Sequence, residues 1–306
     1  MLRLSDIKLV CSKEELKLLP EGKVLINTIN AHSYNTAQKD EAFSTALDTS
    51  YLNVNVNVND NVNGNDNGND NGNENDNVNG NGNDNENGRK YLIPDGVAIV
   101  KACKWLKAKS QPKERIAGWD LYAFEMQRQN EKGEMRNEKC RVMFMGSSER
   151  VLGLIRQRAA VDYPNLEVVT YSPPYKAEFS EEEDREIIRA INEAQPDLLW
   201  IGMTAPKQEK WTWAHWQELD INCHVGTIGA VFDFYAGTAQ RAPLWWQRHG
   251  LEWLYRLLKE PKRMWRRYVI GNPLFVWNVM KERERQRQRE QVLGDNGNVN
   301  VNENRF

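Results

Sequence analysis

The stretch Asp197–Glu209, DLLWIGMTAPKQE, contains the pattern on which the fold prediction rests. Its first five residues, which end at Ile201, are almost wholly apolar, as is typical of a strand buried on both faces of a sheet. A polar loop follows at once, and Pro206 stands where a helix should begin, because proline is favoured at the first helical position. The stretch therefore predicts a strand, a polar loop and a helix in immediate succession.

The same succession recurs on both sides of this stretch. Upstream, the apolar run Arg141–Met145 (RVMFM) enters Gly146-Ser147-Ser148, and a helix is expected from there to Asp162. Further strands are predicted at Lys23–Ile29, Tyr91–Ile93, Leu166–Thr170 and Asn222–Thr227, and further helices at Tyr34–Leu47, Val97–Leu106 and Glu181–Ala194. This alternation predicts an α/β fold, a Rossmann-like parallel sheet with helices on both faces.

One segment does not follow this alternation. From Asn53 to Gly88 every odd position is asparagine, and every even position is valine, aspartate, glycine or glutamate. Asparagine and glycine are poor strand formers and no apolar face is sustained, so we predict a disordered insertion at 53–88 within a core of residues 1–242. Metal binding by its carboxylates is disfavoured, because such spacing without fixed geometry gives weak sites. The pattern returns at Asp295–Asn304, which predicts a disordered tail at 291–306.

The last part of the chain has a different composition. From Pro243 onward tryptophan, tyrosine and leucine are interleaved with arginine and lysine, which predicts amphipathic helices in a basic aromatic appendage at 243–290. Its basic residues either form a solvated face or meet anionic lipid, with Trp265 and Trp277 at the lipid surface. The second interpretation is favoured, because each basic residue near such a surface contributes about 1 kcal/mol.

The amino-acid composition restricts the cellular compartment and the binding partners that we expect for this protein. The 306 residues carry 41 Lys and Arg against 43 Asp and Glu, and the net charge of -2 disfavours a whole-protein polyanion binder. The four cysteines form no C-x-x-C pattern and are expected to be reduced thiols. The N-terminus does not resemble a signal peptide, and no run approaches the roughly 18 apolar residues of a membrane span. We therefore expect a cytoplasmic protein.

Four loops at predicted strand ends are rich in polar residues. They are Thr28–His32, Pro94–Gly96, Gly202–Glu209 and Gly226–Asp233. Ligands of open α/β sheets bind at the loops that leave the carboxyl ends of the strands. Each loop alone is equally consistent with a helix cap or a turn. The residues by themselves thus leave both interpretations open.

Six motifs follow one another along the chain. They are Thr28-Ile29-Asn30-Ala31, Pro94-Asp95-Gly96, Arg115–Leu121 (RIAGWDL), Thr204–Glu209 (TAPKQE), Phe232–Pro243 (FDFYAGTAQRAP) and Glu252–Arg263 (EWLYRLLKEPKR). In their order and their residue types, these motifs resemble those of the WecG/TagA/CpsF glycosyltransferases, glycosyltransferase family 26. The resemblance spans nearly the whole chain outside the repeat and the tail. The sequence departs from the family's motifs in two loops. Thr204 stands where the family usually has a glycine, and Thr227-Ile228 are extra residues between two glycines.

The resemblance implies a reaction and a set of site residues. It implies inverting transfer of an N-acetylmannosamine-like sugar from a UDP-sugar to a polyprenyl-diphosphate-linked acceptor, in cell-surface polysaccharide synthesis. Such a transfer needs a base for the acceptor hydroxyl and positive charge at the leaving diphosphate. By resemblance, Asp95 is expected to be the catalytic base. The expected substrate-binding residues are Thr28, Asn30, Arg115, Gln208, Arg256, Arg263 and Arg266, and the nucleotide is expected to contact Gly226, Gly229 and Asp233.

The resemblance also implies partners. The family resembled is thought to act without metal, and the sequence lacks the D-x-D motif that binds metal in many other glycosyltransferases, so no cofactor is expected. The expected partners are the UDP-sugar, the lipid-linked acceptor and an anionic membrane surface at the inner face of the plasma membrane, with self-association left open.

Two alternatives remain, a nucleotide-sugar-binding protein without turnover and a nucleic-acid-binding module that uses the basic appendage. The near-neutral total charge disfavours the second, so nucleic acid is not an expected partner. A dehydrogenase is disfavoured because no G-x-G-x-x-G follows a predicted strand.

Overall fold

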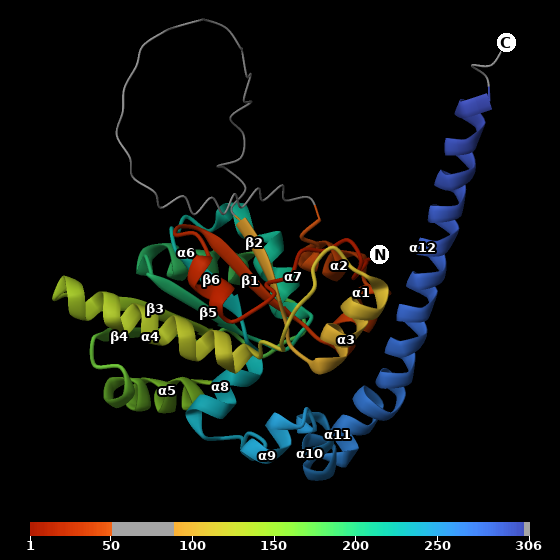
Figure 1. Cartoon of the computed structure of the whole chain (residues 1–306). Helices are drawn as coiled ribbons and strands as arrows, with labels where there is room; N and C mark the ends of the chain where they lie inside the picture. Colours follow the sequence, from red (N-terminus) through yellow and green to blue (C-terminus); the bar gives the residue numbers. More distant parts are fainter. Residues whose placement is uncertain (51–88, 303–306) are drawn as a thin grey trace, which may run out of the picture.

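A six-stranded parallel sheet forms the centre of the protein, in the strand order β2-β1-β6-β5-β3-β4 (Figure 1). The computed structural model describes residues 1–50 and 89–302, with side chains up to 291, so the predicted insertion 53–88 lies outside the described residues. The strands are β1 (Val24–Ile29), β2 (Arg89–Pro94), β3 (Cys140–Gly146), β4 (Leu166–Tyr171), β5 (Leu198–Gly202) and β6 (His224–Thr227). The predicted α/β fold with a Rossmann-like parallel sheet is confirmed.

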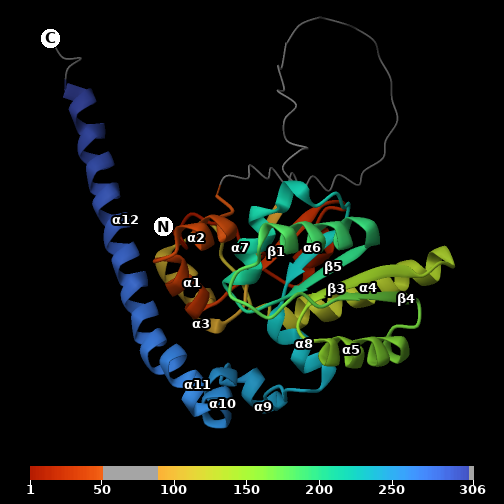
Figure 2. The same ribbon diagram turned by 180° about the vertical axis from the view of Figure 1, so that it is seen from behind.

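Helices cover both faces of the sheet (Figures 1 and 2). On one face lie α4 (Gly118–Arg136), α5 (Glu149–Asp162) and α8 (Gly229–Ala236), and on the other α6 (Glu181–Ala194), α7 (Lys207–Ala214) and the 3-10 turn η2 (Trp216–Glu218). Within β5, Leu198 and Trp200 pack on the first face, and Leu199 and Ile201 on the second. Burial on both sides is therefore the reason that this strand is a continuous apolar run rather than an alternating one.

The N-terminal part forms a third cluster at the β1–β2 side of the sheet. It contains α1 (Ala31–Ala37), α2 (Glu41–Leu47) and α3 (Val97–Leu106), whereas the 3-10 turn η1 (Glu14–Leu18) packs through Leu16 on the face that α4 covers. The single helix predicted at 34–47 is two helices, because Asp40 adopts an extended conformation and its carboxylate accepts the Phe43 N–H at 3.0 Å, which starts a new helix.

The 19-residue helix α4 was not predicted. Its buried face combines apolar residues such as Leu121 and Met126 with the polar residues Glu125 and Gln129. This mixture weakens the apolar periodicity on which helix prediction depends. Part of the buried face is held by polar contacts instead of apolar packing, since the Glu125 carboxylate pairs with Arg128 at 2.9 Å.

Helices also form the C-terminal part. They are α9 (Leu244–Arg248), α10 (Glu252–Lys259), α11 (Pro261–Trp265), the π-helical turn η3 (Arg266–Ile270) and α12 (Gly271–Asn302). The backbone of α12 is helical up to Asn302, where the sequence predicts disorder, and residues 303–306 lie outside the described residues. No helix in the described part of the chain combines the length and apolarity that a membrane span requires.

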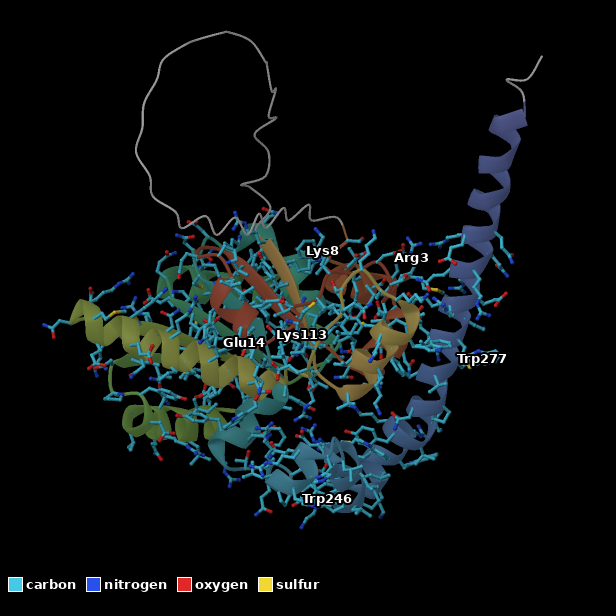
Figure 3. All side chains as sticks on the ribbon, viewed as in Figure 1. Arg3, Lys8, Glu14, Lys113, Trp246 and Trp277 are labelled. Carbon is cyan, nitrogen blue, oxygen red and sulfur yellow. The ribbon has the colours of Figure 1, made fainter. Side chains whose placement is uncertain are left out.

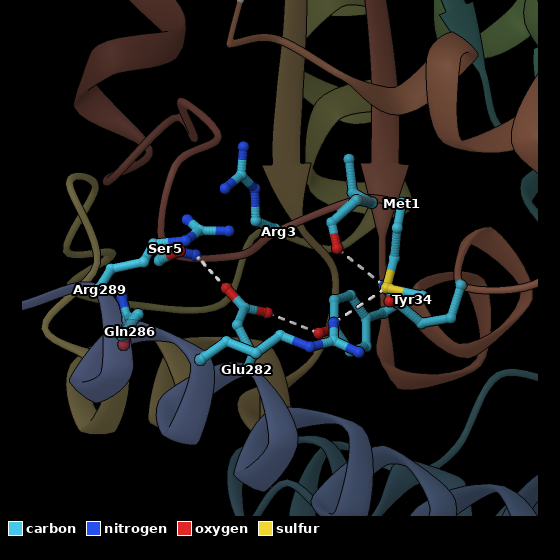
Figure 4. Close-up of a pocket in the computed structure, with 10 residues that line it drawn as sticks. Met1, Arg3, Ser5, Tyr34, Glu282, Gln286 and Arg289 are labelled. Carbon is cyan, nitrogen blue, oxygen red and sulfur yellow. Dashed lines mark hydrogen bonds between the residues drawn. The ribbon is translucent and has the colours of Figure 1, made fainter. Parts of the chain in front are cut away.

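A buried carboxylate anchors α12 to the rest of the protein. Glu282 accepts the Ser5 backbone N–H at 2.7 Å and the Tyr34 hydroxyl at 2.6 Å (Figure 4). Burial and the neighbouring Glu282 charge both raise the pKa of Tyr34, so this hydroxyl remains a donor. The contact joins the long C-terminal helix to residues near the start of the chain.

All four cysteines are unpaired, as the sequence predicts. Burial raises the pKa of the Cys103 thiol to about 12 and that of the Cys223 thiol to about 12. These two thiols are therefore protonated and behave as small apolar side chains.

Candidate active site at the carboxyl ends of the strands

Asp95 lies directly after β2, where β1 and β2 end side by side. Its backbone N–H donates to the Ile29 carbonyl at 2.8 Å, and the Ile116 N–H donates to the Pro94 carbonyl at 3.0 Å. The helix cap of α3 is Gly96, whose φ of 145° favours glycine, and no side chain caps this helix. The carboxylate of Asp95 is therefore not used as a helix cap, although a cap is the usual structural role of an aspartate here.

Three arginines surround a single buried carboxylate near Asp95. Glu252, the first residue of α10, accepts from Arg115 Nη1 at 2.9 Å and from Arg256 Nη2 at 3.0 Å. The Nε of Arg241 lies 3.8 Å from the same carboxylate. Burial acts to raise the pKa of Glu252, but Arg256, Arg115 and Arg241 together hold it below its ordinary value. Glu252 is therefore ionised and gathers guanidinium groups from three separate segments.

The pKa of Asp95 depends on this cluster. Burial raises this pKa above its ordinary value and the charge of Glu252 adds to the effect, while Arg256, Arg115 and Arg267 act against it. No side chain in the described part of the chain donates a hydrogen bond to the Asp95 carboxylate. A carboxylate with a raised pKa and unoccupied lone pairs is suited to take a proton from a hydroxyl.

Thr28 and Asn30 come from the neighbouring strand end. Thr28 pairs in register with Ile93 of β2, so it lies at the level where β2 leads into Asp95. Asn30 caps α1, since its Oδ1 accepts the backbone N–H groups of the second and third residues of that helix at 3.0 and 3.1 Å. The cap occupies the amide oxygen, so any contact with a sugar would use the NH2 group. The structure thus brings Thr28, Asn30 and Asp95 together.

Gln208 is buried and connects two helices. Its Oε1 accepts the Gly229 N–H at 3.2 Å, and its Nε2 donates to Glu209 Oε1 at 2.9 Å. A Cβ at Gly229 would lie 2.1 Å from the Met203 carbonyl oxygen and 2.8 Å from Gln208 Oε1, so this close contact requires glycine. Each end of the Gln208 amide has a protein partner, and its predicted contact with substrate stays a prediction.

Sequence reasoning missed Glu209, a buried carboxyl group next to Gln208. Burial raises the pKa of Glu209 to about 7, although the hydrogen bond from Gln208 acts in the opposite direction. Its Oε2 atom is buried and has no hydrogen-bond partner in the described part of the chain. An uncompensated buried carboxylate is costly, so this group favours the protonated form.

Two of the residues predicted to contact the nucleotide, Gly226 and Asp233, have structural roles in packing and in a turn. A Cβ at Gly226 would lie 2.2 Å from the Trp200 ring, so glycine permits this ring to pack against β6. The Asp233 carboxylate accepts the Thr238 hydroxyl at 2.9 Å after α8. Thr227, which departs from the family pattern, is buried. Nucleotide contacts at Gly226, Gly229 and Asp233 stay predictions.

The structure separates the predicted arginines into two groups. Arg256 joins the Asp95 cluster, whereas Arg263 is exposed and pairs with Glu260 at 2.8 Å. Arg266 is also exposed and lies over the ring of Trp265 at 5.5 Å. The third cation that acts on Asp95, after Arg256 and Arg115, is Arg267, which sequence reasoning missed. Its Nε atom is buried and has no hydrogen-bond partner in the described part of the chain.

Two further observations concern ligand sites. Among residues 1–50 and 89–302, no group of three or more His, Cys, Asp or Glu side chains is placed to hold a metal ion, and metal independence stays a prediction. A cavity of about 400 Å³ lies between the N-terminal segment and α12, lined by residues that include Arg3, Tyr34, Glu282 and Arg289 (Figure 4). Asp95 does not line this cavity.

The cluster combines two kinds of chemistry. A carboxylate with a raised pKa can accept the proton of a hydroxyl group, which makes that oxygen a nucleophile. Guanidinium groups can hold phosphate oxygens through paired N–H donors and stabilise the negative charge of a leaving phosphate. The arrangement therefore suits transfer of a group from a phosphate to a hydroxyl.

Comparison with known proteins gives a consistent result. A sequence model of the glycosyl transferase WecG/TagA/CpsF family matches residues 85–289, which include Asp95 and the arginine cluster but not Thr28 and Asn30. Curated relatives carry the name N-acetylglucosaminyldiphosphoundecaprenol N-acetyl-beta-D-mannosaminyltransferase. The protein of Bacillus spizizenii strain W23 is 31% identical over 191 residues, which cover 62% of this chain and 68% of the relative.

Two further relatives bear the same name. The protein of Bacillus subtilis strain 168 is 28% identical over 193 residues, which cover 63% of this chain and 69% of that relative. The protein of Staphylococcus aureus strain MW2 is 28% identical over 198 residues, which cover 64% of this chain and 71% of that relative. The family match covers more than half of the chain and includes the residues that form the Asp95 cluster. The chain therefore belongs to the WecG/TagA/CpsF family of glycosyl transferases.

Proposed function

We propose that this protein transfers an N-acetylmannosamine-like sugar from a UDP-sugar to a polyprenyl-diphosphate-linked acceptor, with Asp95 as the base. The observation that carries the proposal is the Asp95 carboxylate, which has a raised pKa and lies near Arg115 and Arg256. The name shared by the relatives, an N-acetylmannosaminyltransferase acting on N-acetylglucosaminyldiphosphoundecaprenol, supports the choice of sugar and acceptor.

In the proposed reaction, Asp95 accepts the proton of the acceptor hydroxyl as that oxygen forms a bond to C1 of the donor sugar. The bond between C1 and the β-phosphate oxygen breaks, and UDP leaves with the electron pair. Attack from the face opposite the leaving group inverts the configuration at C1. Arg115 would stabilise the charge on the leaving diphosphate, and Arg256 that on the acceptor diphosphate, so the proposed step requires no metal.

Peripheral membrane association forms part of the proposal, because a polyprenyl acceptor is held in a bilayer. Exposed apolar side chains and basic side chains occur together along α9–α12. Figure 3 shows Trp246 at the end of the molecule formed by the short helices, and Trp277 on the side of α12 away from the sheet. Interfacial tryptophan and basic residues are typical of surfaces that meet anionic lipid. Binding to vesicles of anionic phospholipid, weakened by a Trp277→Ser substitution, would support this assignment.

The transfer itself is tested by UDP release. Purified protein is incubated with UDP-N-acetylmannosamine and a lipid-linked N-acetylglucosaminyl diphosphate acceptor, and then with other UDP-sugars. We expect UDP release that requires the acceptor. Binding of UDP-sugars without release by any donor would instead support a nucleotide-sugar-binding protein, and salt-sensitive binding of DNA or RNA without release would support a nucleic-acid-binding module.

A further inference from the structure

We infer that Glu252 is a positioning residue, whose carboxylate holds the arginines that would otherwise neutralise Asp95. The inference deepens the proposed function and rests on it, because it takes Asp95 to be the base. Glu252 is not a catalytic residue in this view, since it acts on the reaction only through the groups around it.

The geometry places Glu252 at the centre of the cluster. Its two carboxylate oxygens are divided between different arginines: Oε2 accepts from Arg115 and Oε1 accepts from Arg256. Arg241 approaches Oε1 as well, at 3.8 Å. The Glu252 side chain is only 11% exposed, so these contacts are largely shielded from water. One carboxylate thus fixes cations from the segment before α4, the segment before α9 and α10 itself.

The contacts matter because Asp95 competes for the same cations. Arginine forms strong paired hydrogen bonds with any carboxylate within reach, and burial strengthens such pairs. Arg115 and Arg256 both act on Asp95 electrostatically, yet their hydrogen bonds go to Glu252. Without Glu252, these guanidiniums would pair with Asp95, occupy its lone pairs and lower its basicity.

Among the described residues, four charged groups are the main electrostatic influences on Asp95. Glu252 and Arg256 come from α10, Arg115 from the segment before α4, and Arg267 from η3. Removing the charge of Glu252 would leave three cations against one carboxylate. The pKa of Asp95 would then fall, because nearby opposite charges favour the ionised form of a carboxyl group.

The test compares the wild-type protein with Glu252→Gln and Glu252→Asp. UDP release is measured from pH 4 to pH 9, and the titration of the Asp95 carboxyl is followed by carbon NMR, assigned with Asp95→Asn. In Glu252→Gln, we expect the acidic limb of the kcat profile and the Asp95 titration to move to lower pH. We also expect kcat at the plateau to fall about tenfold, since a weaker base is a poorer catalyst. Glu252→Asp, which keeps the charge, should restore the position of the acidic limb.

Glu125→Gln provides the matched control. Glu125 is also a buried carboxylate paired with an arginine, Arg128 at 2.9 Å, and it contacts His224 at the opposite end of the sheet. Its loss should lower the melting temperature without moving the Asp95 titration. An Asp95 titration unchanged in Glu252→Gln would overturn the inference. If Glu252→Gln does not fold, Glu252→Asp decides the question: an Asp95 titration that moves to lower pH although the carboxylate is kept would overturn the inference.

The NMR titration requires no turnover. A wild-type protein that releases no UDP with any donor therefore contradicts the proposed function, while the Asp95 titration still decides the role of Glu252.

Discussion

The backbone N–H of Asp95 donates a hydrogen bond to the carbonyl oxygen of Ile29 at 2.8 Å. This bond continues the parallel ladder between β1 and β2 by one residue, so the sheet itself fixes the main chain of Asp95. The side chain takes no part in this bond. A substitution of the carboxylate should therefore alter chemistry without altering the fold.

Asp95→Asn is expected to remove transfer while UDP-sugar binding remains. An amide of the same shape cannot accept the hydroxyl proton, and loss of general base catalysis typically lowers kcat by about 10² to 10⁴-fold. UDP release measures turnover, and calorimetric titration with the UDP-sugar measures binding. Turnover close to that of the wild type would remove Asp95 from the role of base.

Arg267→Gln should move the acidic limb of the kcat profile to higher pH. Arg267 acts to lower the pKa of Asp95, so its removal raises that pKa and a higher pH is needed to ionise the base. The direction is opposite to that expected for Glu252→Gln. Arg263→Gln should leave the limb in place, because the Arg263 guanidinium is exposed and pairs with Glu260. Equal shifts of the acidic limb in Arg267→Gln and Arg263→Gln would contradict the conclusion that Arg267 lowers the pKa of Asp95.

Glu209 should make the stability of the protein depend on pH. Its folded pKa of about 7 lies above the ordinary value of 4.5, so its contribution is complete below pH 4.5 and is lost as pH rises through 7. Glu209→Gln stays neutral and should be more stable than the wild type at pH 8, by up to about 3 kcal/mol. Urea unfolding at pH 5 and pH 8 measures the difference. Glu167→Gln, which removes an exposed carboxylate, is the control, and a similar gain there would refute the prediction.

Gly226→Ala should destabilise the fold. The added methyl would meet the ring of Trp200 at 2.2 Å inside the sheet, and overpacking of this kind costs about 1 to 3 kcal/mol. Gly153→Ala on α5 is the matched control, because nothing lies within 4 Å of its added methyl, and it should gain about 0.5 to 1 kcal/mol. Thermal unfolding of the two variants gives the comparison, and equal melting temperatures would argue against the packing role of Gly226.

The regular part of the fold could be predicted because local signals and packing agree. The helices at 97–106 and 181–194 have the predicted boundaries, and Ser180 caps the second through a capping box with Glu183. The helix α4 could not be predicted, since its buried residues include the polar Glu125 and Gln129, whose partners His224 and Asp197 lie far away in sequence. The break at Asp40 is a capping signal inside an otherwise helical pattern.

The candidate site was predictable where its residues follow strands. Asp95, Thr28 and Asn30 meet because parallel strands end at one edge, and this edge can be inferred from the alternation of elements. Glu252 carried a weak signal, its spacing of four residues from Arg256, which is common in ordinary surface pairs. Arg267 carried none, because the π-helical turn changes the number of residues per turn and so changes which arginine faces inward.

Among the described strands, β2, which leads to Asp95, is one of the two edge strands of the sheet. One flank of this residue is therefore built by the sheet through Ile29, and the other by side chains from the last quarter of the chain, among them Glu252 and Arg267. The two flanks can change independently during evolution. Substitutions in the C-terminal helices can reshape the approach to Asp95 without breaking any hydrogen bond between strands.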